Sequence, residues 1–191
     1  MVFSGQRVYE SWLYSLFNVF YSSCPIIVYA LFDAEFADNS LMKYPFLYFA
    51  GIQYKHFNKK RIAAWMCNAI AQSVLIGILS LYILSTSAVT KNGRVIDMWC
   101  SGALILGLCV VNANFKVITF SHSHSITSMF FIFGSIALYL ISILLVNFMS
   151  SSDLYDTFIQ LFTIPNFYFA NIMILLATSW MDFGQERYGS N

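Results

Sequence analysis

The stretch FNVFYSSCP, residues 17–25, places polar side chains and a proline inside an otherwise apolar run. Asn18 and Ser22 are four residues apart, so they share one face of an α-helix. Pro25 has no N–H and its ring clashes with the preceding turn, so we expect the helix to kink or open near Tyr21 and Ser22. An opened carbonyl beside an amide and a hydroxyl is typical of a transport site at the bilayer midplane. A proline kink satisfied by its own serines explains the spacing equally well.

The composition places this stretch in a membrane protein. Of the 191 residues, 59% are hydrophobic and only 10% are charged, and the mean hydropathy is +0.67. Soluble domains carry about 25% charged residues, so a soluble chain this apolar could not cover its surface with polar groups. The net charge of +1 gives no general attraction to nucleic acid, which is therefore not an expected partner.

The lengths of the apolar segments predict an all-α fold, a polytopic transmembrane helix bundle. A bilayer core needs about 20 mainly apolar residues per helix, and a helix pairs all of its own backbone polar groups. Segments of this kind predict about five spans, near residues 12–32, 62–84, 98–120, 126–148 and 158–181.

The distribution of lysine and arginine predicts the orientation. With the loop 33–61 in the cytoplasm, the cytoplasmic side also receives the connection after residue 120 and the C-terminus, and the loops 85–97 and 149–157 become exoplasmic. The cytoplasmic side then holds most of the basic residues: Lys43, Lys55, Lys59, Lys60, Arg61, Lys116 and Arg187. The other side holds Arg7, Lys91 and Arg94. Cytoplasmic enrichment of basic residues is the usual pattern. The exoplasmic N-terminus that results would be natural if a membrane-spanning segment preceded residue 1.

Several other polar residues lie in or beside the apolar segments. Interhelical hydrogen bonding is the expected role of most amides there: Asn68, Gln72, Asn112, Asn114, Asn147 and Asn171. Lys116 is expected to extend its ammonium to the cytoplasmic headgroups. Asp33, His122 and His124 are expected to be solvated, and the two histidines lack further ligands for a metal site.

The usual signatures of soluble catalysis are missing from the sequence. There is no glycine-rich phosphate loop, no GxSxG and no HExxH. The segment 33–61 is too short for an independent core. We therefore assign no catalytic residue, no metal site and no cofactor to this chain, and we do not expect it to hydrolyse ATP alone.

With the order of segments fixed, the chain resembles type-IV P-type ATPases, the phospholipid flippases, over nearly its whole length. The first segment is similar to the family's sixth membrane helix, which follows an FSGQ-x-x-Y loop. The matching residues are Phe3-Ser4-Gly5-Gln6, Tyr9, Phe17-Asn18, Tyr21-Ser22, Pro25, and Asp33 with Glu35. The stretches YPFLYFAGIQYKHFNKKRIAAW, DMWCSGALILGLCVVNANFK, GSIALYL and IPNFYFANIMILLA resemble the regions of helices seven to ten. Departures are Ser22 for threonine, Ala30 for glycine, and Ile52 within Gly-Gln.

The resemblance implies a function for the complete protein. It implies that the chain is the C-terminal membrane part of a translocase, with the first five helices and the ATP-hydrolysing domains absent from it. Such a pump moves phospholipid from the exoplasmic to the cytoplasmic leaflet and uses Mg and ATP. The resemblance implies that Asn18 and Ser22 contact the lipid headgroup, with Pro25 shaping the helix. It also implies as partners the N-terminal catalytic half and a two-span accessory subunit, in the plasma membrane or in Golgi or endosomal membranes.

Two alternatives involve no transport. A flippase-like module can be a membrane scaffold fused to another enzyme, such as a nucleotide cyclase. It can also be a free-standing protein of five spans that packs against a partner.

Overall fold

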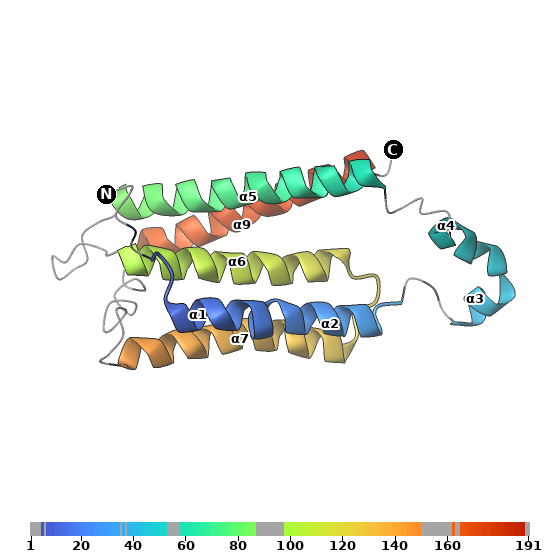
Figure 1. Cartoon of the computed structure of the whole chain (residues 1–191), viewed down its shortest axis with the longest axis horizontal. Coiled ribbons are helices and arrows are strands. Elements are labelled where there is room, and N and C mark those ends of the chain that lie inside the picture. The colour runs from blue at the N-terminus through green and yellow to red at the C-terminus, as the bar shows by residue number, and fades with distance from the viewer. Residues whose placement is uncertain are drawn as a thin grey trace.

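The computed structural model describes residues 5, 7–34, 36, 38–52, 58–86, 98–149, 162 and 165–189, and the regular structure in this part of the chain is helical (Figure 1). The first membrane segment consists of α1 (Ser11–Leu16), a π-helical turn η1 (Phe17–Tyr21) and α2 (Ser23–Phe32). After it come α3 (Asp38–Lys43), the 3-10 helix η2 (Pro45–Tyr48) and α4 (Phe49–Ile52). The long helices are α5 (Lys59–Thr86), α6 (Met98–Phe120), α7 (Ile126–Phe148) and α9 (Pro165–Gly189). The all-α prediction is confirmed.

Within the described residues, four helical segments are long and apolar enough to cross a membrane: Ser11–Phe32, Lys59–Tyr82, Met98–Phe120 and Ile126–Phe148. The fifth expected span, 158–181, is only partly described. The helix α9 covers it from Pro165 and runs on to Gly189, so its crossing of the membrane stays a prediction. The connection 33–61 was expected as a loop, but three short helices lie within it. Proline at the first position of η2 suits a helix start, because its missing N–H has no helical partner there.

The helix α6 is the central element of the bundle (Figure 1). It packs against α5 and α9 on one side, and against α2 and α7 on the other. The chain alternates in direction, so α3, α4, the start of α5, the connection between α6 and α7, and the end of α9 lie at the same end (Figure 1). The basic residues Lys43, Lys59, Lys60 and Arg61 therefore gather at that end.

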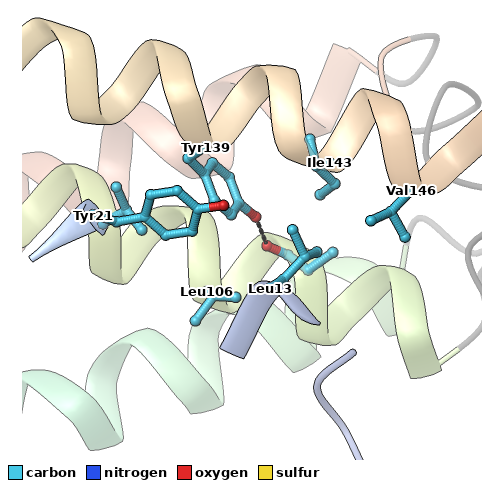
Figure 2. Close-up of a cluster of buried hydrophobic side chains, with 8 residues drawn as sticks. Leu13, Tyr21, Leu106, Tyr139, Ile143 and Val146 are labelled. Carbon is cyan, nitrogen blue, oxygen red and sulfur yellow. Dashed lines mark hydrogen bonds between the residues drawn. The ribbon is translucent and has the colours of Figure 1, made fainter. Parts of the chain in front are cut away.

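A hydrophobic cluster joins the first segment to α6 and α7, as Figure 2 shows. The buried rings of Tyr21 and Tyr139 meet edge to face with centroids 5.5 Å apart. The Tyr139 hydroxyl donates to the Ala103 carbonyl at 2.5 Å. Gly107 leaves the space for this ring, because a Cβ there would lie 3.0 Å from Tyr139. The cluster fixes the middle of the first segment against α6 and α7.

Candidate functional site

The polar stretch of the first segment forms an opened turn, residues 17–22, within the helix. The Ser22 N–H donates to the Phe17 carbonyl at 3.0 Å, which is the i to i−5 bond of a π-helix. The Ser23 hydroxyl donates to the carbonyl of Asn18. Local π-helical turns are frequent at functional sites. The opening lies where the sequence predicted a disturbed helix, although the part that Pro25 plays in it stays a prediction.

The carbonyl of Tyr21 is the group that this arrangement must satisfy. An α-helix would pair it with the N–H of residue 25, but Pro25 has none. The side chain of Asn114, on α6, supplies a donor instead: its Nδ2 lies 3.1 Å from the Tyr21 oxygen. The two residues are 93 positions apart in the sequence.

Asn114 connects three helices through one amide. Besides its bond to Tyr21, Nδ2 donates to the Val110 carbonyl of its own helix at 2.9 Å. Its Oδ1 accepts from the hydroxyl of Ser135, on α7, at 2.9 Å. The orientation of the amide is fixed, because the Tyr21 and Val110 carbonyls both need a donor. Only the amide nitrogen carries hydrogens; the amide oxygen can only accept. With only 1% of Asn114 exposed, each of these bonds is made away from water.

The two predicted site residues lie on this opened turn with different exposure. Asn18 is exposed and Ser22 is half-buried. The apolar segment that carries them has no charged side chain from residue 12 to residue 32. A neutral amide and a neutral hydroxyl can exchange hydrogen bonds with a polar group that enters from outside, without holding it by charge.

A second polar group, the Asp182 cluster, ties α5, α6 and α9 together. The Asp182 Oδ1 accepts from Asn68 at 2.9 Å and from Gln72 at 2.7 Å, both on α5. The Gln72 Oε1 accepts from Asn112, on α6, at 3.2 Å. Lys116 forms an ion pair with Asp182 at 3.3 Å. The predicted interhelical role is confirmed for Asn68, Gln72 and Asn112, and Asn114 fills it at the opened turn.

Lys116 makes an ion pair that the sequence analysis did not predict. Its ammonium turns to the Asp182 carboxylate, and 23% of its side chain is exposed against 5% for Asp182. A buried carboxylate needs a paired charge, and Lys116 supplies it. Contact of the ammonium with the headgroups stays a prediction. The amide of Asn171, by contrast, donates to the Phe167 carbonyl of its own helix at 2.7 Å.

Asp33 closes the C-terminal end of α2; its side chain is partly exposed, and its carboxylate also accepts hydrogen bonds from the connection between α6 and α7. Its Oδ1 accepts from the backbone N–H of Ser123 at 2.8 Å, from that of His122 at 3.0 Å, and from the Ser121 hydroxyl at 3.2 Å. Burial opposes the charge, but these hydrogen bonds outweigh it and lower the pKa of Asp33 below its ordinary value of 3.8. The first segment is thus fastened to the connection between α6 and α7. Glu35 lies outside the described residues.

The side chains of His122 and His124 are exposed. Among the residues that the structure describes, no group of three His, Cys, Asp or Glu side chains could hold a metal ion.

Reasoning from the sequence missed Asp182, although a usable signal for it existed: polar residues four apart recur on three helices. These pairs are Asn68 with Gln72, Asn112 with Lys116, and Thr178 with Asp182. Since residues four apart share a helix face, three polar faces of this kind favour a common buried contact.

Comparison with known proteins gives a consistent result. The family described as phospholipid-translocating P-type ATPase C-terminal matches residues 1–190. The Arabidopsis thaliana "Probable phospholipid-transporting ATPase 5" is 31% identical over 151 residues, which are 78% of this chain and 12% of that protein. The Arabidopsis "Phospholipid-transporting ATPase 10" is 29% identical over 178 residues, 91% of this chain and 15% of that protein. The human "Phospholipid-transporting ATPase IC" is 28% identical over 137 residues, 72% of this chain and 11% of that protein. The chain spans only about a tenth to a seventh of the length of these relatives.

Proposed function

Since the chain belongs to the phospholipid-translocating P-type ATPase C-terminal family, we propose that it forms the C-terminal membrane part of a phospholipid pump. The pump moves phospholipid from the exoplasmic to the cytoplasmic leaflet. ATP hydrolysis with Mg, in cytoplasmic domains outside this chain, drives the movement. This chain is an integral membrane protein, and its own contribution is to bind the headgroup and guide it across.

The observation that carries the proposal is the opened turn with its exposed amide at Asn18 and half-buried hydroxyl at Ser22. A headgroup that crosses an apolar core loses its water, which is costly unless other groups replace the lost hydrogen bonds. Neutral groups can do so and still release the lipid, whereas a fixed charge would hold it. We assign Asn18 and Ser22 to contact with the headgroup, and Pro25 to the shape of the helix around them.

The charges of the described residues support the orientation. Basic residues gather at the end that holds α3, α4 and the start of α5, and we propose that this end faces the cytoplasm. The same end would then meet the N-terminal catalytic half of the pump. A two-span accessory subunit is a further proposed partner, and the plasma membrane or a Golgi or endosomal membrane is the proposed location.

The proposal is tested on the native protein, purified with an antibody against residues 182–191. Its size is measured first, because a product several times larger than 21.8 kDa is expected for a complete pump. Uptake of fluorescent phospholipids with serine, ethanolamine and choline headgroups is then measured in proteoliposomes with and without Mg and ATP. Asn18→Ala is expected to lower lipid-stimulated turnover by about tenfold, the effect of one lost hydrogen bond.

The matched control is Ser15→Ala, one turn earlier on the same segment. The Ser15 hydroxyl is exposed and donates to the Ser11 carbonyl of its own helix, so turnover should stay unchanged. Native protein near 21.8 kDa without ATP-dependent uptake would remove the pump proposal and favour a scaffold. Active transport that Asn18→Ala leaves intact would remove only the site assignment.

A further inference from the structure

We propose that Asn114 is a positioning residue for the lipid path, with Ser135 as its support. The proposal rests on the proposed function of the opened turn. Neither residue contacts the headgroup in this proposal. Asn114 acts through the Tyr21 carbonyl, and by holding that carbonyl it determines where Asn18 and Ser22 stand.

The first step is the missing helical donor. Because Pro25 has no N–H, the Tyr21 carbonyl has no α-helical partner in its own helix. A buried carbonyl without a donor is costly, and Tyr21 is fully buried. The opened turn can therefore persist only if another element supplies the donor. The Nδ2 of Asn114 does so at 3.1 Å.

The second step is the rigidity of the donor itself. Asn114 uses its second N–H on the Val110 carbonyl and its oxygen on the Ser135 hydroxyl, so the amide cannot turn away without breaking two other bonds. Ser135 is buried, and its single hydroxyl hydrogen lies within reach of both the Asn114 Oδ1 at 2.9 Å and the Ile132 carbonyl at 3.1 Å. The helices α6 and α7 thus aim one fixed N–H at one carbonyl of the first segment.

The third step joins this contact to the lipid path. The Tyr21 carbonyl immediately precedes Ser22 and follows Asn18 by less than one turn. A shift of the Tyr21 peptide therefore moves the hydroxyl and the amide proposed to receive the headgroup. Removal of the donor should change how well lipid binds more than how fast a bound lipid is moved.

The test uses the native protein and measures uptake against phospholipid concentration. Asn114→Leu keeps nearly the same size and removes the donor, so the apparent KM for lipid should rise about tenfold while kcat changes less. Ser135→Ala should raise KM in the same direction but by a smaller factor. Ser73→Ala, on α5, is the matched control, because its exposed hydroxyl donates to the Ile70 carbonyl of its own helix at 2.8 Å, as the Ser135 hydroxyl does to the Ile132 carbonyl.

A double variant separates positioning from simple stabilisation. Pro25→Ala in the Asn114→Leu background gives residue 25 an N–H, which can satisfy the Tyr21 carbonyl within the helix. The melting temperature should then recover, whereas KM should not, because an α-helical bond closes the turn and moves Asn18. Hydrogen exchange of residues 17–26 should be faster in Asn114→Leu than in wild type and slow again in the double variant.

The outcomes are distinguishable. Wild-type protein without ATP-dependent uptake overturns the proposed function and this inference with it. Active wild type with Asn114→Leu and Ser135→Ala equal to Ser73→Ala overturns the positioning role alone. Recovery of both melting temperature and KM in the double variant assigns Asn114 a stabilising role only. If Asn114→Leu fails to fold, the KM of Ser135→Ala against that of Ser73→Ala decides.

Discussion

Removal of the Lys116 charge should destabilise the protein more than removal of the Asp182 charge, although the two side chains form one ion pair. The reason is their unequal burial: 5% of the Asp182 side chain is exposed and 23% of the Lys116 side chain. In Lys116→Met, a buried carboxylate remains with only the amides of Asn68 and Gln72. In Asp182→Asn, the remaining ammonium can turn towards water or headgroups.

These environments set the expected magnitudes. A buried charge left without its partner costs about 3–5 kcal/mol, which applies to Lys116→Met. The Lys116 side chain is partly exposed, so its loss of the Asp182 partner resembles the loss of a surface salt bridge. Asp182→Asn should therefore cost about 1 kcal/mol. The double variant leaves a neutral cluster that keeps its amide contacts, and it should also cost about 1 kcal/mol. A coupling free energy of about 3–5 kcal/mol between the two substitutions follows.

Unfolding in detergent micelles, followed by circular dichroism, measures these differences. For a chain of this size, 1 kcal/mol corresponds to about 2–4 °C, so Lys116→Met should melt about 6–20 °C lower. Lys43→Met, which replaces an exposed lysine 5.8 Å from the Tyr44 ring centroid, is the control and should change little. The reasoning is refuted if Asp182→Asn melts lower than Lys116→Met, or if the double variant is as unstable as the two single effects added together.

Two further predictions follow from single contacts. A methyl group at Gly102 would overlap the backbone carbonyl of Val8, so Gly102→Ala should lower the free energy of unfolding by about 1–3 kcal/mol. Gly134→Ala, where nothing lies within 4 Å of the added carbon, should leave it unchanged or raise it by up to about 1 kcal/mol; equal effects of the two would contradict the packing. Because the folded-state pKa of Asp33 is lowered, its stabilising effect is present above the ordinary value of 3.8 and is lost as the pH falls through the lowered pKa. The melting temperature should therefore fall on acidification below pH 3.8, and less steeply in Asp33→Asn; parallel curves would remove the effect.

The local features of the first segment could be predicted from the sequence, because their causes are local. Pro25 removes a donor from its own helix, and this predicts a disturbance one turn earlier, where the opened turn lies. The group that satisfies the Tyr21 carbonyl could not be predicted in the same way. Asn114 is 93 residues further along, and several intramembrane amides could have filled that position equally well. Only the packing of α6 against the first segment selects it.

The burial of Asp182, on the other side of α6, could not be predicted from the sequence either. It falls one residue beyond the predicted end of the last span, where a carboxylate is normally solvated. Burial of this residue depends on α5 and α9 lying side by side, which no local pattern specifies. The spacing of polar pairs predicts that a face is polar, but the partner of that face is determined by the tertiary arrangement.

The hydrogen bonds of Asn114 and the Asp182 cluster meet on α6, and their unequal strength indicates which contact breaks first. Asn112 and Asn114 are two residues apart, so they point to nearly opposite sides of the helix. One side is bound to α5 and α9 through an ion pair and several amide bonds. In the described contacts, the other side is bound to the opened turn through one side-chain hydrogen bond of 3.1 Å and the apolar packing of Tyr21. A force that displaces the first segment should therefore break the Asn114–Tyr21 contact while α5, α6 and α9 move as one body.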